Sequence, residues 1–167
     1  MKTATIRVAL LSLALLGLAA NCQAKNNCPW INEATASGLL GGDAVGEFTE
    51  PSAGQPAVCT ITQTGAGFTR TLRIAVEVVP DTHARWQTAV QACGKSAAPL
   101  PAIGNEASIC LLDNRKAGLA ELVVGRVRDQ LFTITLATTL KDDLILTRMT
   151  LKDKAFTASE QVAGNLF

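Results

Sequence analysis

Four cysteines constrain the fold of this chain more than any other feature of its sequence. The fifth cysteine of the chain, Cys22, lies near the N-terminus, and the other four, Cys28, Cys59, Cys93 and Cys110, are an even number that indicates pairing wherever disulfides persist. Three pairings are open. The most local joins Cys28 to Cys59 and Cys93 to Cys110, and each bridge would stabilise the fold by about 2 to 4 kcal/mol. The alternative is four buried free thiols. No Cys-x-x-Cys spacing indicates a zinc site or a redox pair.

The first 24 residues have the layout of a secretory signal peptide. Lys2 and Arg7 give a positive start, and residues 8–20 are apolar except for one serine and one glycine. A membrane helix needs roughly 20 apolar residues, so this run predicts a cleaved signal and no transmembrane anchor in the mature protein. The small residues Cys22 and Ala24 place the cut before Lys25. The mature protein, residues 25–167, is then periplasmic or extracellular.

Lipid anchoring through Cys22 is the alternative interpretation of the same segment. A lipoprotein signal requires a small residue directly before the modified cysteine, and Asn21 stands there. This departure favours ordinary cleavage.

The composition of residues 25–167 limits the classes of partner that the mature chain can bind. Of the 15 basic residues two lie in the signal, so 13 remain against 14 acidic ones. A nearly neutral chain suggests no basic face for nucleic acid or anionic lipid. The length fits a single domain, and no motif indicates a cofactor. Tyrosine is absent and there are only two tryptophans, which argues against a sugar-stacking platform.

Hydrophobic periodicity predicts three helices and five strands. The first helix is capped by Asn32 and ends at Gly41, and the second opens at Pro80 and Asp81, repeats apolar residues to Cys93 and ends at Gly94. Strands are expected at 58–63, 69–79, 107–112, 119–127 and 130–138, with loops at 50–55 and 96–104.

The details of three segments follow from the same patterns. In the second strand, Leu72, Ile74, Val76 and Val78 alternate with polar residues, and in the last strand Phe132, Ile134 and Leu136 alternate with Leu131, Thr133 and Thr135. Residues 64–67, and Arg128 with Asp129, are expected to form hairpin turns. Thr139 and Asp142 resemble a capping box before a long final helix. The competing interpretation begins a strand at Leu144.

Together these elements predict an α+β fold. A mainly antiparallel sheet of about five strands would carry two or three helices on its faces, with two disulfides.

The chain also resembles a broad family of small exported bacterial proteins of unknown function, many of them lipoproteins. More distantly, it is similar to extracytoplasmic sensor domains of receptor serine/threonine kinases. The resemblance is carried by Cys28 with Pro29, a small-residue helix ending in Leu39, Leu40 and Gly41, Cys59 in the next strand, and the segment 100–107 (LPAIGNEA). It implies two disulfides and a helix-covered antiparallel sheet, and it brings no catalytic residues.

Candidate catalytic groups are few. His83, the single histidine, lies beside Asp81 at a helix start, and no Gly-x-Ser-x-Gly elbow offers it a nucleophile. Two carboxylate pairs could serve a hydrolase, Asp142 with Asp143 and Asp113 with Glu106. Asp142 and Asp143 are explained more simply as helix N-terminal charges.

One loop is the best candidate for contacting a ligand or partner. Gly104, Asn105 and Glu106 join the disulfide-tied second helix to a strand, and a packing turn is the simpler interpretation of them. Arg115 and Lys116 lie at an expected hairpin tip. The glycines of 38–42 (GLLGG) are expected to end a helix, because a Walker motif needs Gly-Lys-Ser/Thr.

The leading functional hypothesis is a non-enzymatic exported domain. It would bind a partner protein or a small apolar ligand in the groove between sheet and helices, in the cell envelope or the medium. An envelope-polymer hydrolase with paired carboxylates is the alternative. A thiol-active protein is the third hypothesis.

Overall fold

The computed structural model describes residues 28–112 and 118–167, and within them the chain forms one antiparallel sheet of seven strands. The predicted signal peptide, Cys22, Asp113, Arg115 and Lys116 lie outside the described residues. The strand order is β1-β2-β3-β7-β6-β5-β4. The strands are β1 (Val45–Thr49), β2 (Ala57–Gly65), β3 (Phe68–Val78), β4 (Ala98–Pro99), β5 (Glu106–Leu112), β6 (Leu119–Val127) and β7 (Gln130–Thr138).

The predicted class and the antiparallel pairing are confirmed, but the prediction of about five strands is wrong. The two missed strands, β1 and β4, are the edges of the sheet. β1 is five residues long and contains Gly46, and β4 has two residues, of which one is Pro99. Glycine and proline are disfavoured in strand interiors, so neither segment shows a strand pattern.

The first helix agrees with its prediction. α1 spans Glu33–Leu40, and the Asn32 side chain accepts a hydrogen bond from the Thr35 N–H at 2.8 Å. Gly41 ends the helix with φ of 79°, a left-handed conformation that glycine adopts at little cost.

The second helix is shorter than predicted. α2 spans Thr82–Val90 with Asp81 as its N-cap, and a 3-10 helix, η1 (Gln91–Ser96), carries the chain on. Cys93 therefore lies in η1, where Gly94 at φ of 54° breaks the helical path.

The final helix is present, but its predicted start is wrong. α3 spans Arg148–Leu166 and is capped by Thr147, whose hydroxyl accepts from the Thr150 N–H at 3.2 Å. The residues before it form neither a strand nor a helical turn. Leu144 is 90 % exposed and Met149 82 % exposed, so neither belongs to a buried helical face.

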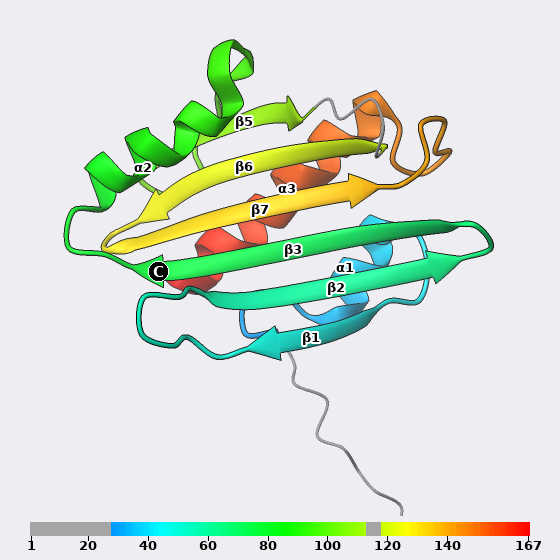
Figure 1. Cartoon of the computed structure of the whole chain (residues 1–167), viewed down its shortest axis with the longest axis horizontal. Helices are drawn as coiled ribbons and strands as arrows, with labels where there is room; N and C mark the ends of the chain where they lie inside the picture. Colours follow the sequence, from blue (N-terminus) through cyan, green and yellow to red (C-terminus); the bar gives the residue numbers. More distant parts are fainter. Residues whose placement is uncertain (1–27, 113–117) are drawn as a thin grey trace, which may run out of the picture.

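Helices cover the two faces of the sheet unequally. α3 and α1 lie behind the sheet in the view of Figure 1 and cover one face. That face carries the core, including Ile74, Ile134 and Val123, three cross-strand neighbours that are fully buried. α2 contacts the other face over β6 and β7. The alternation predicted for β7 is confirmed, because Phe132, Ile134 and Leu136 face the core and are fully buried.

Both disulfides form, in the most local of the three possible pairings. Cys28 is bonded to Cys59, which joins the segment before α1 to β2 across a sequence separation of 31 residues. Cys93 is bonded to Cys110 across 17 residues and holds η1 on β5. Among the residues described, no helix is both long and apolar enough to span a membrane.

Candidate functional site

The loop predicted as a contact site has a structural role at two of its three positions. Gly104 has φ of 59°, and a Cβ there would overlap the carbonyl oxygen of Arg126. The Asn105 N–H donates to that carbonyl at 2.8 Å, and the Asn105 side chain accepts from the Arg128 N–H at 2.7 Å. Gly104 and Asn105 thus fix the turn between β6 and β7, as the packing-turn interpretation predicts.

Glu106, the third position, is brought together with His83, which the sequence placed 23 residues away. His83 Nδ1 donates to Glu106 Oε2 at 2.7 Å, and Arg126 Nε donates to the same oxygen at 2.5 Å. The hydrogen bond from Arg126, followed by that from His83, holds the pKa of Glu106 below its ordinary value. The carboxylate is therefore ionised, and its Oε2 accepts both bonds, which does not suit a general acid.

The other ring nitrogen of His83 contacts no nucleophile in the described structure. It lies 2.9 Å from the Gln87 amide nitrogen, and the ring stacks on Trp86 with centroids 5.9 Å apart. Beside this cluster is a shallow pocket of about 260 Å³, lined by Trp86 and residues 99–108. A relay needs a hydroxyl or thiol on the free imidazole nitrogen, so the arrangement supports an anchor between α2 and the sheet rather than catalysis.

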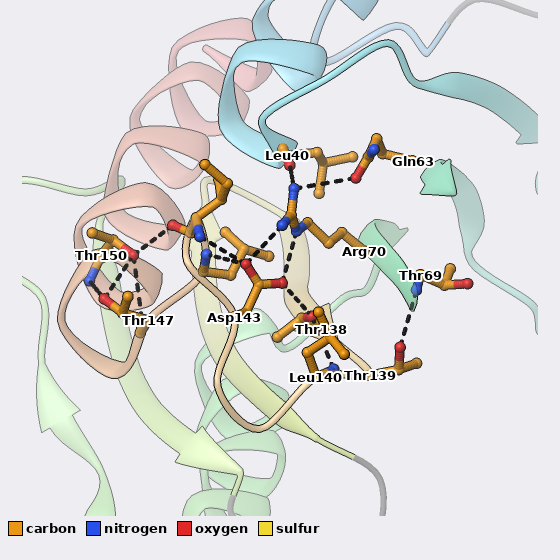
Figure 2. A network of polar contacts seen from close by, with 12 residues as sticks. Leu40, Gln63, Thr69, Arg70, Thr138, Thr139, Leu140, Asp143, Thr147 and Thr150 are labelled. Carbon is orange, nitrogen blue, oxygen red and sulfur yellow. Dashed lines mark hydrogen bonds and ion pairs between the residues drawn. The ribbon is translucent and has the colours of Figure 1, made fainter. Parts of the chain in front are cut away.

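Asp142 and Asp143, one of the two predicted carboxylate pairs, lie in different environments, the first exposed and the second buried. Asp143 is buried and receives two hydrogen bonds from the Arg70 guanidinium, Nε to Oδ2 at 2.7 Å and Nη2 to Oδ1 at 2.8 Å. The Thr138 hydroxyl donates to Oδ2 at 2.6 Å, as Figure 2 shows. The backbone N–H groups of Ile145 and Leu146 complete the set at 2.7 and 2.9 Å.

These bonds determine the ionisation of Asp143. Burial alone would raise its pKa, but the hydrogen bonds from Arg70, Thr138 and the two backbone N–H groups outweigh burial and hold the pKa well below the ordinary range. The interpretation of Asp143 as a helix N-terminal charge is wrong, since α3 begins at Arg148 and the carboxylate binds Arg70 on β3. A carboxylate that is fully occupied in this way gives no support to paired-carboxylate hydrolysis.

Two concavities lie at the end of the sheet where β3 finishes, on either side of the turn formed by residues 50–56. This turn is closed by a hydrogen bond from the Gln55 N–H to the Ser52 carbonyl at 2.8 Å, and Gly54 adopts φ of 73° within it. Gly54, Gln55 and Glu77 line both concavities, so the two adjoin.

The first concavity, which we call the apolar hollow, measures about 520 Å³. Trp30 forms part of its wall and is held by an edge-to-face contact with Phe48, at 5.8 Å between ring centroids, and by a hydrogen bond from Asn165 to its carbonyl. Val78 was predicted to face the core with Val76 but is 70 % exposed, because β3 ends there. The lining consists of Trp30, Pro51, Ser52, Gly54, Gln55, Ala57, Val76, Glu77, Val78, Val79 and Gln130.

The second concavity, which we call the arginine groove, measures about 330 Å³ and lies between α2 and the sheet face opposite α3. Its floor is small and apolar, with Ala75, Leu131 and Ala89, and Thr133 adds a hydroxyl. Arg73 and Arg85 bring two guanidinium groups to it from β3 and α2.

Sequence reasoning predicted a groove between sheet and helices but none of its residues. The alternation of β3 correctly predicts that Arg73 and Glu77 share the face opposite the core. Which part of that face α2 leaves open depends on the pairing of β3 with β7, a contact between strands more than 50 residues apart. No local signal in the sequence contains this information.

A comparison of the chain with models of protein families, with curated proteins and with solved structures found no match in any of the three. The similarity to exported bacterial proteins and kinase sensor domains stays a prediction.

Proposed function

We propose that this chain is exported and acts outside the cytoplasm as a non-enzymatic domain that binds a small ligand with an apolar body in the apolar hollow. The observation that carries the proposal is the hollow itself. Its volume lies within the roughly 300 to 1,000 Å³ typical of small-molecule sites. The exposed side chain of Val78 offers the ligand apolar surface to bury, and Trp30, which is mostly buried, forms part of the wall.

The hollow has the rigidity that binding requires. A disulfide ties the segment before Trp30 to β2, and the hydrogen-bonded turn 52–55 forms the opposite rim. Preorganised walls lose little conformational entropy when a ligand enters, and this favours affinity. The two disulfides are also compatible with an oxidising compartment outside the cytoplasm.

The described residues offer less in favour of the two enzymatic alternatives. Asp143 is buried and engaged by Arg70, and Glu106 is held ionised by Arg126 and His83, so neither suits the role of the acid in a carboxylate pair. All four cysteines of the described residues are in disulfides, which leaves no thiol for exchange among them.

The test uses a neutral apolar probe, N-phenyl-1-naphthylamine, whose fluorescence rises in apolar surroundings. Val78→Asn removes exposed apolar surface from the hollow, and Val45→Asn is the matched control, an exposed valine (59 %) on β1 that does not line the hollow. We expect wild type and Val45→Asn to bind the probe equally, and Val78→Asn to bind it about fivefold more weakly. Equal binding by all three proteins, or no fluorescence increase with wild type, would contradict the proposal.

A further inference from the structure

The arginine groove contains a guanidinium group that no described residue neutralises. Arg73 is exposed, and it makes no hydrogen bond or ion pair with any residue that the structure describes. Its cross-strand neighbours on the same face are Thr60 and Thr135. Because the backbone of a strand is fixed, an arginine on it presents its five N–H donors toward the groove within a limited range of positions.

The second arginine of the groove is already oriented. Arg85 Nε donates to Glu77 Oε1 at 3.0 Å, an ion pair that links α2 to β3. Its Nη groups make no other bond within the described part of the chain. Glu77 thus neutralises Arg85 and holds its guanidinium at the groove, while Arg73 keeps its full charge.

The charge balance of the groove selects the chemical class of ligand. Two guanidinium groups and one carboxylate leave a single positive charge in the lining. A monoanion such as a carboxylate balances this charge, and its two oxygens match the fork of a guanidinium. A phosphate dianion would carry more negative charge than the lining can balance, and the Glu77 carboxylate would repel it.

The neighbouring apolar hollow determines what the rest of such a ligand would be. Arg73 and Val78 lie on opposite faces of β3, but the two concavities adjoin at the end of this strand, where Gly54, Gln55 and Glu77 line both. An extended molecule could place a carboxylate at Arg73, cross the small floor at Ala75 and Leu131, and reach the hollow beside the turn 50–56.

We propose that the arginine groove is the acid-recognition half of the site, and that the ligand is an amphipathic carboxylic acid whose carboxylate binds Arg73 and whose apolar part extends toward the apolar hollow. This inference rests on the proposed function, to which it adds the ligand class and the recognising residue.

The test compares decanoate with decan-1-ol, which share an alkyl chain and differ in the charged head. Both are titrated at neutral pH into the oxidised, isotope-labelled protein, and affinities are taken from shifts of the backbone amide signals of β3 and α2. We expect wild type to bind decanoate about tenfold more tightly than decan-1-ol. Arg73→Gln should remove this preference by weakening decanoate alone, and Arg73→Lys should retain part of it.

Lys95→Gln is the matched control, because it removes the same charge from an exposed position on η1 outside the groove. It should keep the wild-type preference, and Arg73→Gln should bind decan-1-ol within about twofold of wild type. If Arg73→Gln still prefers decanoate to decan-1-ol, the inference is wrong and the proposed function stands. The same conclusion follows if wild type shows no preference for decanoate but binds decan-1-ol in a manner that depends on Val78. If neither decanoate nor decan-1-ol shifts the amide signals around the apolar hollow and the arginine groove, both the inference and the proposed function are wrong.

Discussion

At the scale of single residues, the ion pair of Arg70 and Asp143 connects more of the molecule than any other polar contact in Figure 2. Arg70 on β3 also donates to the Leu40 carbonyl at the end of α1 and to the Gln63 side chain on β2. Asp143 fixes the loop between β7 and α3 through two backbone N–H groups. The pair thus holds both helices of the covered face to the sheet.

Removing the carboxylate should therefore destabilise the fold strongly. Asp143→Asn leaves the Arg70 guanidinium buried without a counter-charge, and we expect a loss of about 3 to 5 kcal/mol in the free energy of unfolding. Urea denaturation followed by circular dichroism measures this loss. The matched control is Asp142→Asn, at an exposed neighbour, which should change stability by less than about 0.5 kcal/mol. Similar losses for the two variants would contradict the assignment.

The same carboxylate should make stability depend on pH. Its pKa in the folded protein lies below the value of about 3.9 that an unfolded aspartate has, so in acid the unfolded chain takes up the proton first. The stabilisation is therefore complete above that value and is lost as the pH falls below it. Between about pH 5 and pH 3, the free energy of unfolding should fall more steeply in wild type than in Asp143→Asn. Parallel slopes would show that Asp143 is not held ionised by the fold.

At the scale of elements, the two disulfides join the segment before α1 to β2 and η1 to β5. Cys93 lies in η1, whose helical path is broken at Gly94, and its bond to Cys110 secures η1 on β5. Closing loops of 17 and 31 residues lowers the conformational entropy of the unfolded chain, which raises its free energy by about 3 and 4 kcal/mol respectively.

Replacing each pair of cysteines by serine tests these values. We expect Cys28→Ser/Cys59→Ser to lower the free energy of unfolding by about 4 kcal/mol, and Cys93→Ser/Cys110→Ser by about 3 kcal/mol. Urea titrations of the two double variants give the comparison. A loss under about 1 kcal/mol for either pair would mean that the residual structure of the unfolded chain, rather than loop closure, dominates.

Elements with a complete local signal could be predicted from the sequence. β6 and β7 have the predicted bounds because two apolar-rich runs flank a two-residue turn, and α1 has both its cap and its glycine end. The start of α3 could not be predicted in this way. Asp143 looks like a helix N-terminal charge, but its partner Arg70 is 73 residues distant, and this contact keeps the loop from becoming helical. The edge strands were missed because they are short and carry glycine or proline.

At the scale of the whole molecule, the candidate site results from unequal covering of the sheet. α1 and α3 cover one face, while α2 packs mainly over β6 and β7 on the other (Figure 1) and reaches β3 and β5 through the side chains of Arg85 and His83. The uncovered end of β3 then carries both concavities. The sequence indicates that the second face of the sheet is polar. The position of α2 on it depends on the strand order, which local patterns do not determine. The polar residues and the glycine of residues 104–106 predict a contact loop, but Gly104 and Asn105 fix the turn between β6 and β7 and Glu106 bonds His83 and Arg126.

The central claim is that the chain is an exported, disulfide-bonded domain that binds a small acid. A native mass spectrum of the protein isolated from its own cell envelope or medium tests this claim most directly. A parallel sample is denatured and treated with a thiol-alkylating reagent. We predict the mass of Lys25 to Phe167 less four hydrogens, no alkyl group added, and an additional small mass that is released on denaturation. A chain that begins at Cys22 with acyl groups, a chain that keeps residues 1–24, or the uptake of alkyl groups would contradict the account.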